Sequence, residues 1–160
     1  IGIVVRLSNG VGAPARKDAD CWMLLVNDLC RQAAQTRKMV LRSSGTQYRD
    51  FITLEDVGRA VRHLLGLNRD GCGDGLFNLG TGTSLSVWEM TQLIARRCQT
   101  TLGFSPDIVR PAPSANEHTP LLVYDCNKLL RTGFHHNGKM EKEIDNILIL
   151  CSQTCLQAER

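Results

Sequence analysis

The sequence is poor in aromatic side chains and lacks several patterns that would assign it at once to a class of protein. Only 5% of the 160 residues are aromatic, no C-x-x-C pair occurs, and no apolar run is long enough to cross a bilayer. The formal net charge is only +3, and the basic residues are scattered along the chain. These absences argue against a membrane-spanning or nucleic-acid-binding protein, so we expect neither a membrane nor a nucleic acid as partner.

The cysteines are odd in number and several fall within apolar helical patterns, where cysteine behaves as a small hydrophobe. The seven are Cys21, Cys30, Cys72, Cys98, Cys126, Cys151 and Cys155. We predict reduced thiols and a cytoplasmic protein. A zinc site that joins cysteines to His135 and His136 is an alternative, but the spacing fits no structural zinc pattern, and we expect no metal.

What the sequence does contain is an alternation of short β-branched runs with longer segments of helical periodicity. Strands are predicted over 1–7, 39–41, 49–53, 76–79 and 107–110, and helices over 20–35, 53–65, 86–100, a short stretch after Asp125, and from 140 onward. The pattern predicts an α/β chain whose strands do not complete a parallel sheet of their own.

Local signals add detail to these elements. The run 1–7 is almost continuously apolar, which is typical of a parallel strand buried on both faces. Asp20 is the expected N-cap of the first helix, TLED and SVWE supply capping boxes for the next two, and Val61 and Leu65 are expected to face inward. The stretches 9–19 and 68–75 are expected to be loops.

The first apolar run ends in Gly10-x-Gly12-x-x-Ala15, which has the look of a dinucleotide-binding loop. Such a loop must open directly into a helix, because the N–H groups at the helix N-terminus hold the pyrophosphate. Here Pro14 and the polar stretch ARKDAD separate the glycines from the next helix. The sequence therefore disfavours a cofactor loop.

Four blocks of the sequence, taken in order, resemble the extended short-chain dehydrogenase/reductases, which are the NAD-dependent epimerase/dehydratase family. The blocks are IVVRLSNGVGAP, GTQYRDFITLEDVGRA, LFNLGTGTSLSVWEM, and DIVRPAP followed by YDCNKLLRTGF, and together they span roughly residues 3–149. The resemblance implies late strand or strands of a Rossmann-type sheet plus the small mixed α/β substrate-binding domain of that family.

The resemblance also implies how the chain is organised. The family's glycine-rich loop and its catalytic Tyr-x-x-x-Lys lie upstream of these blocks, so we expect the N-terminal dinucleotide-binding half to be missing. Residues 1–160 are expected to form one unit, with 1–12 as a late strand of the cofactor domain and 151–160 as a frayed tail. Tyr124 and Lys128 have the Tyr-x-x-x-Lys spacing, but a helix is only beginning there. No catalytic residue is assigned, and the chain alone is expected to be inactive.

Several positions match the family's substrate contacts. The resemblance implies that Asn9 holds the diphosphate and sugar, that Arg49 and Arg110 clamp the diphosphate, and that the backbone around Val40, Leu41 and Arg42 lies along the nucleotide base. Simpler interpretations stay open. Asn9 is also suited to a turn, Arg49 to an ion pair with Asp50 or Glu55, and Arg110 to a solvated strand end. Asp56, Asn78, Gly80 and Gly82 are expected to be structural.

The function implied is the nucleotide-sugar-binding portion of an NAD(P)-dependent epimerase, dehydratase or reductase. NAD or NADP would bind mainly to the other half of the protein, and the expected partner is a nucleotide-diphosphate sugar. The alternatives are a non-catalytic sugar-nucleotide-binding module and a protein-interaction module that reuses the fold. Two departures from the family pattern bear on the choice: no Asp follows Arg110, and Gly10 replaces an aromatic residue. An exposed first strand would also favour self-association or a homo-oligomer.

Overall fold

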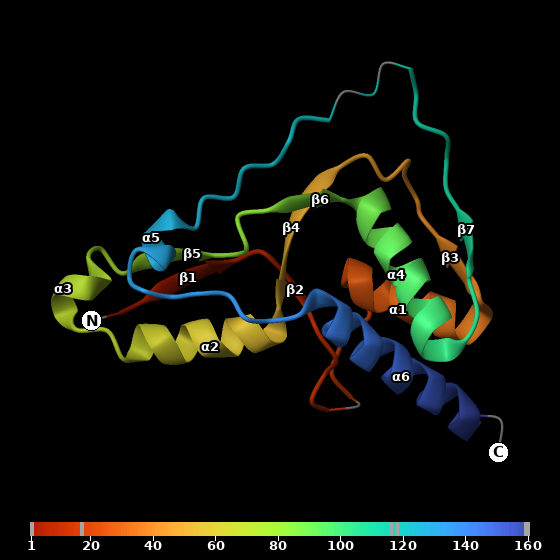
Figure 1. Cartoon of the computed structure of the whole chain (residues 1–160), viewed down its shortest axis with the longest axis horizontal. Coiled ribbons are helices and arrows are strands. Elements are labelled where there is room, and N and C mark those ends of the chain that lie inside the picture. Colours follow the sequence, from red (N-terminus) through yellow and green to blue (C-terminus); the bar gives the residue numbers. More distant parts are fainter. Residues whose placement is uncertain (1, 17, 116, 118, 159–160) are drawn as a thin grey trace.

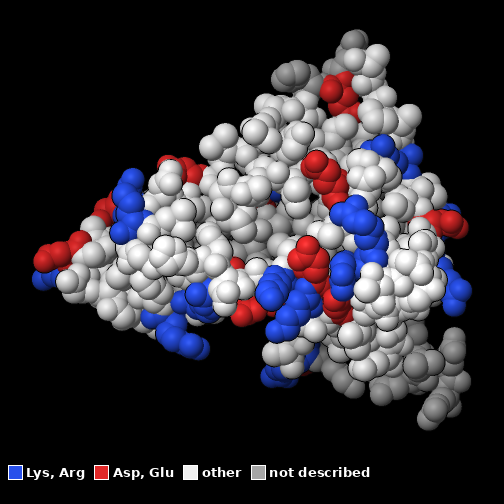
Figure 2. Space-filling model, in the orientation of Figure 1, with Lys and Arg blue, Asp and Glu red and all other residues white. Residues whose placement is uncertain are grey.

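The computed structural model describes residues 2–16, 18–115, 117 and 119–158 (Figure 1, and Figure 2 as a space-filling view in the same orientation). The elements follow one another as β1 (Val4–Leu7), β2 (Asn9–Val11), α1 (Leu25–Thr36), β3 (Lys38–Val40), β4 (Tyr48–Thr53), α2 (Leu54–Leu65), α3 (Arg69–Cys72), β5 (Leu76–Leu79), β6 (Ser84–Ser86), α4 (Val87–Leu102), β7 (Asp107–Val109), α5 (Asn127–Leu130) and α6 (Met140–Ala158). This order confirms the predicted α/β class.

The strands pair in three small sheets that are mostly parallel. β1 pairs with β5 and β3 pairs with β7, both in parallel, while β4 lies between a parallel β2 and an antiparallel β6. Each parallel pair joins strands far apart in the sequence, with helices in the intervening chain. The expectation that the strands complete no single parallel sheet is therefore confirmed for the described residues.

Two hydrophobic clusters hold these elements together. In the larger one, α1, α4 and α6 pack together beside β3 and β7, as Figure 1 shows on its right-hand side. In the smaller one, α2 and α5 pack on β1 and β5 through Ile52, Phe77, Leu79 and Leu129. Arg97 of α4 adds a two-pronged hydrogen bond to Asp145 of α6, with N···O distances of 2.8 and 2.6 Å.

Two of the helix starts follow the predicted capping chemistry. The Thr53 hydroxyl accepts the N–H of Asp56 at 3.1 Å at the start of α2. At the start of α4, Ser86 and Glu89 form a reciprocal capping box. These caps satisfy N–H groups that the first helical turn leaves without intrahelical partners, so both helices begin within one residue of the predicted position.

The remaining boundary predictions were less accurate. α1 begins at Leu25 rather than near Asp20, and its N-cap residue Leu24 makes no side-chain cap. The predicted loop 9–19 contains β2, and the predicted loop 68–75 contains the single-turn helix α3. β6 lies where no strand was predicted, between the predicted strand 76–79 and the predicted helix from 86. The two short strands exist because β4 pairs with both, which is a contact that no local signal reveals.

The burial predicted for the first strand and for part of α2 was wrong. Val4 is 61% exposed and Leu7 47% exposed, because β1 has only β5 as a neighbour among the described residues. On α2, Val61 and Leu65 are 45% and 79% exposed, since the cluster covers only the face that carries Ala60 and Leu64. Ile1 lies outside the described residues.

The last helix reaches further than expected. α6 continues to Ala158, so most of the segment predicted as a tail is helical, while residues 159–160 lie outside the described residues. Whether this end frays in solution stays a prediction.

Candidate functional site

The first candidate residue, Asn9, lies at a junction of three chain segments. Its side-chain N–H donates to the backbone oxygen of Asp50 at 2.9 Å, which links β2 to β4. The Asp50 carboxylate is fully buried and accepts hydrogen bonds from the Thr81 N–H and hydroxyl and from the Gly82 N–H, between 2.7 and 3.1 Å. Asn9 thus joins strand β2 to the strand that carries Arg49.

Gly80 allows this junction to close. A Cβ at this position would lie 2.5 Å from Asp50 Oδ1 and 2.6 Å from a ring carbon of Tyr124. The turn 80–82 is therefore held from both sides, as expected for a structural turn without chemistry of its own.

Arg49 is exposed on β4 and, within the part of the chain that the structure describes, forms no ion pair. The ion pair with Asp50, which the sequence left open, does not form because that carboxylate is buried and bonded to Thr81 and Gly82. Side chains alternate along a strand, so Arg49 points to the opposite face from Tyr48 and Asp50. Its guanidinium keeps its donors available for a ligand.

Arg110 follows β7 and is held in one orientation by two contacts. Its guanidinium carbon lies 3.6 Å from the centre of the Trp88 ring, and one N–H group donates to the Ser44 backbone oxygen at 2.6 Å. Arg110 is half-buried, so it is not the solvated strand end that the sequence left open. The stacking on the Trp88 ring and the hydrogen bond to the carbonyl oxygen both fix the orientation of the guanidinium before a ligand binds.

A pocket of about 370 Å³ opens beside Arg110. It is lined by Thr46, Tyr48, Ser86, Trp88, Arg110, Pro113, Glu117 and Thr119. The lining combines one arginine, two aromatic rings and several hydroxyl groups, which suits a polar ligand that carries negative charge and a flat group.

Glu117 is a pocket residue that the sequence did not reveal. Hydrogen bonds from the Ser44 hydroxyl and then from the Thr46 hydroxyl hold the pKa of its carboxyl below the usual range against the opposing effect of burial, and nearby Arg110 adds a weaker lowering effect. Asn116 and His118 beside it lie outside the described residues. A ligand anion at Arg110 therefore shares the pocket with a carboxylate.

The structure brings only some of the predicted site residues together. Arg110 lines the pocket with Tyr48, whereas Arg49 and Asn9 do not line it. Val40 and Leu41 lie at the end of β3 beside β7, where the Leu41 N–H donates to Val109 O at 2.9 Å. Leu41 is buried, and Val40 and the following Arg42 are exposed near the strand end that leads to Arg110.

Tyr124 and Lys128 do not form a dyad. The Tyr124 hydroxyl donates to Arg6 O at 2.8 Å, while the Lys128 ammonium contacts the Asp74 carboxylate and Leu76 O. Burial is the main cause that raises the pKa of Tyr124, which is the opposite of what a general base needs. Both side chains serve to attach the 124–128 segment to the β1–β5 sheet.

The glycine pattern near the N-terminus is a packing feature. Gly10 is part of β2, and a Cβ on Gly12 would lie 2.8 Å from a side-chain carbon of Leu54 at the start of α2. The next helix, α1, begins only at Leu25, so no helix N-terminus faces these glycines through a short turn. These residues therefore do not fit a dinucleotide phosphate loop.

The cysteines of the described region are thiols, and most are buried. Cys30, Cys98 and Cys151 share the larger cluster, and burial raises the pKa of Cys98 to about 11. The side chain of Cys155 lies outside the described residues. Within the described ranges, no group of three or more His, Cys, Asp or Glu residues is placed to hold a metal ion. None of the described helices is long and apolar enough to cross a membrane.

Comparison with known proteins gives a consistent family signal. The model of the NAD dependent epimerase/dehydratase family matches residues 2–80. No curated protein matches the chain.

Solved structures match over almost the whole chain. The structure of RMD from Pseudomonas aeruginosa complexed with NADPH matches with a TM-score of 0.72 at 19% identity, and the match covers 95% of this chain and 48% of the RMD chain. The UDP-glucose 4-epimerase of Thermotoga maritima, with UDP-glucose, matches with a TM-score of 0.70 at 18% identity, and the match covers 95% of this chain and 46% of the epimerase chain. TunA, an NAD dependent NDP-hexosamine 5,6-dehydratase of tunicamycin biosynthesis, matches with a TM-score of 0.64 at 26% identity, and the match covers 95% of this chain and 46% of the TunA chain.

The chain spans about half the length of these solved structures. It therefore has their α/β fold, and its residues 2–80 match the NAD dependent epimerase/dehydratase family.

Proposed function

We propose that this chain is the nucleotide-sugar-binding part of an NAD(P)-dependent epimerase, dehydratase or reductase. The proposal rests on Arg110, whose guanidinium stacks on the Trp88 ring in the lining of a pocket of about 370 Å³. The chain that carries this pocket matches the NAD dependent epimerase/dehydratase family over residues 2–80. Fold alone does not specify a function, so the proposal depends on the chemistry of this pocket. NAD or NADP would bind mainly to residues that precede those in this chain.

The pocket residues have complementary tasks in this proposal. The Arg110 guanidinium neutralises a diphosphate oxygen without first being reorganised, because Trp88 and Ser44 O already fix it. The backbone of Val40, Leu41 and Arg42 borders the nucleotide base. Arg49 lies outside the pocket, on the face of β4 opposite Tyr48, and would supply the second cation to a ligand that extends past the strand edge where Asn9 bonds to Asp50 O.

The chain's own contribution to catalysis would be orientation. Binding the nucleotide diphosphate tightly allows the sugar ring to be presented to a reactive centre elsewhere in the protein. No step of hydride or proton transfer is assigned to these residues, since Gly10–Ala15 does not fit a cofactor loop and Tyr124 is bonded to Arg6 O. We expect no catalysis by this chain alone and no tight binding of NAD to it.

Calorimetric titration of UDP-glucose onto Arg49→Ala, Arg110→Ala and the matched control Arg96→Ala tests the proposal. A charge-assisted hydrogen bond contributes about 1.5–3 kcal/mol, so each site variant should raise the Kd by about ten- to a hundredfold. Arg96 is exposed on α4 outside the pocket, and its replacement should leave the Kd unchanged. Arg49→Lys should restore affinity only in part, because an ammonium cannot reproduce the guanidinium fork.

The result that would contradict the proposal is equal affinity for UDP-glucose in all four variants. Equal weakening of the three alanine variants would also contradict it, because general charge attraction would then explain binding. NAD serves as the specificity control, and micromolar NAD binding to the chain would show that residues 10–15 had been misinterpreted.

Glu117 favours one alternative, a protein-interaction module that has lost ligand affinity. Its carboxylate shares the pocket with Arg110 and is bonded to Ser44 and Thr46. Glu117→Gln removes this negative charge. If neither the wild type nor this variant binds UDP-glucose, the interaction module is the better description, and a gain in affinity by the variant supports the nucleotide-sugar site.

We also propose that residues 1–160 fold as one unit in the cytoplasm, with 1–12 belonging to the cofactor domain of the whole protein. The thiol state of the described cysteines supports the location, and the pairing of β2 with β4 supports the single unit. Limited proteolysis tests the second point, because early cleavage near residue 12 would separate the first strand from the rest.

A further inference from the structure

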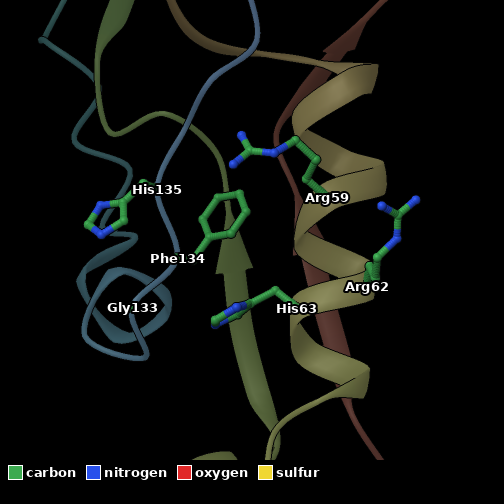
Figure 3. A pocket seen from close by; sticks show the side chains of 6 residues that line it. All are labelled: Arg59, Arg62, His63, Gly133, Phe134 and His135. Atoms are coloured by element: carbon green, nitrogen blue, oxygen red, sulfur yellow. The ribbon is translucent and has the colours of Figure 1, made fainter.

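A second cavity, of about 300 Å³, lies between α2 and the segment that follows α5. It is lined by Arg59, Arg62, His63, Gly133, Phe134 and His135 (Figure 3). It shares no lining residue with the pocket beside Arg110. Each titratable residue in this lining is an arginine or a histidine, so the cavity wall can carry only positive charge.

Phe134 lies in the wall of this cavity, which we call the α2 cavity. Figure 3 shows Arg59 and His63 extending from α2 toward the Phe134 ring, Arg62 extending from the other side of the helix in this view, and the His135 ring on the far side of the facing segment. The Arg59 guanidinium carbon and the His63 ring both lie 5.7 Å from the ring centre of Phe134. Because Phe134 is only 3% exposed, it provides a rigid wall that fixes its polar neighbours.

Among the described residues, one carboxylate contacts this lining, and its oxygens already accept hydrogen bonds from other groups. Asp56 lies 2.7 Å from Arg59 and also accepts the N–H groups of Asn137 and Gly138 at 2.9 Å each. It offsets at most the charge of Arg59. Arg62, His63 and His135 form no ion pair in the described part of the chain, so the charge of the Arg62 guanidinium is left uncompensated.

The hydrogen bonds around His63 define which ring nitrogen carries its proton. The Thr132 hydroxyl has one hydrogen, and that hydrogen is donated to Leu129 O at 2.6 Å. The contact of 2.7 Å between Thr132 Oγ1 and His63 Nε2 therefore requires Nε2–H to be the donor. Nδ1 has no hydrogen-bond partner among the described residues, and in the imidazolium form it becomes an additional donor for an anion.

The donor set matches a phosphate group. The two guanidinium groups offer several N–H donors, His63 adds Nδ1–H in its imidazolium form, and the lining contains no carboxylate. Planar guanidinium groups bind phosphate oxygens in pairs. A volume of about 300 Å³ is sufficient for a phosphate or a small phosphate monoester.

We propose that the α2 cavity is a second anion site, which binds the phosphate group of inorganic phosphate or of a small phosphate monoester through Arg59, Arg62 and His63. Arg62 is the residue to test, because it is exposed and has no ion pair whose loss would affect folding. Arg59 is less informative, since its replacement would also remove the contact to Asp56.

The experiment is a titration of inorganic phosphate and, separately, glycerol 3-phosphate onto the 160-residue chain, followed by amide chemical shifts in NMR spectra. We expect saturable shifts in residues 59–63 and 132–135. Arg62→Gln should raise the Kd at least tenfold, and His63→Gln should raise it by a similar factor. Arg96→Gln removes an exposed arginine outside the α2 cavity and should leave the Kd within twofold of the wild type.

Arg110→Gln separates this site from the one proposed for the nucleotide sugar. Unchanged shifts in residues 59–63 in this variant support an independent site, and their loss would overturn the proposal by locating phosphate at Arg110. Equal weakening by Arg62→Gln and Arg96→Gln would also overturn it, because diffuse charge attraction would then suffice. Tighter binding of glycerol 3-phosphate than of inorganic phosphate would identify a monoester as the ligand, whereas equal binding would identify free phosphate.

Discussion

The buried carboxylate of Asp50 accepts a hydrogen bond of 2.7 Å from the backbone N–H of Gly82. The two residues belong to separate sequence blocks, RDFI and NLGTG, that carry much of the family resemblance. Thr81 adds its own N–H and hydroxyl to the same carboxylate. The two blocks therefore interact with each other, and this interaction fixes the strand that carries Arg49.

Replacing Asp50 by Asn should destabilise the chain strongly. The amide has a single acceptor oxygen, and its NH2 group would face the N–H donors of Thr81 and Gly82. Hydrogen bonds to a buried charged group contribute about 1.5–3 kcal/mol, so we expect the free energy of unfolding to fall by about 2–3 kcal/mol. Urea unfolding measures this loss, and the exposed Asp70→Asn is the matched control. A similar small effect of both variants would contradict the role of Asp50.

Two glycines provide a matched pair in which the same substitution should have opposite effects. Gly80→Ala places a Cβ within 2.5 Å of Asp50 Oδ1, so the turn must shift and the free energy of unfolding should fall by at least 2 kcal/mol, the order of a lost buried contact. Gly58→Ala meets nothing within 4 Å on α2 and should stabilise the helix by about 0.5–1 kcal/mol. Thermal denaturation of both variants checks the signs, and equal losses would contradict the explanation.

The parts of the fold that the sequence predicted well are those specified by neighbours in the chain. Thr53 and Ser86 begin helices because their hydroxyl groups reach N–H groups three residues away. The period of apolar residues in α4 and α6 is likewise local. Such features need no knowledge of the rest of the molecule.

The parts that were missed depend on contacts distant in the sequence. β2 is a strand only because it pairs with β4, and Val4 is exposed only because β1 has one neighbour among the described residues. Asp20 has the right side chain for an N-cap, yet α1 begins at Leu25. In the candidate site, Arg110 was predicted from a block match, whereas Glu117 lies in a loop without periodicity and is brought to Arg110 by Ser44 and Thr46.

Asp56 should make the stability of the chain depend on pH in the acid range. Burial tends to raise the pKa of this carboxyl, but the N–H groups of Asn137 and Gly138 and the Arg59 guanidinium together hold it below its usual value. A lowered pKa stabilises the folded state fully above the unfolded value of about 4, and this stabilisation is lost as the pH falls through the folded value.

Urea unfolding of the wild type and of Asp56→Asn between pH 7 and pH 3 tests this dependence. The variant should be less stable at pH 7, and its free energy of unfolding should decrease less than that of the wild type as the pH falls below about 4. Parallel curves for the two proteins over the whole range would show that Asp56 does not contribute.

The exposed first strand should cause the isolated chain to self-associate. Val4 and Leu7 are 61% and 47% exposed on a strand with a single described neighbour, and exposed apolar strands tend to pair with other chains. Sedimentation velocity should show a sedimentation coefficient that rises with concentration. The double variant Val4→Lys/Leu7→Lys should abolish this rise. Leu65→Lys, on an exposed position of α2, should leave it unchanged, and an equal effect of this control would point away from the strand.

Trp88 should contribute to nucleotide-sugar affinity although it need not touch the ligand. Its ring supports the Arg110 guanidinium at 3.6 Å, and such a cation–π contact contributes about 0.5–2 kcal/mol. Trp88→Leu should therefore raise the Kd for UDP-glucose by about two- to thirtyfold, while Trp88→Phe keeps an aromatic face and should have a smaller effect.

The matched control for this substitution is Trp22→Leu. Trp22 carries Arg31 over its ring at 5.5 Å and does not line the pocket beside Arg110. The same loss of an indole and of a cation–π contact should therefore leave the affinity for UDP-glucose unchanged. If Trp22→Leu weakens binding as much as Trp88→Leu does, the loss reflects general destabilisation. If neither does, the orientation of Arg110 over Trp88 is not what binds the diphosphate.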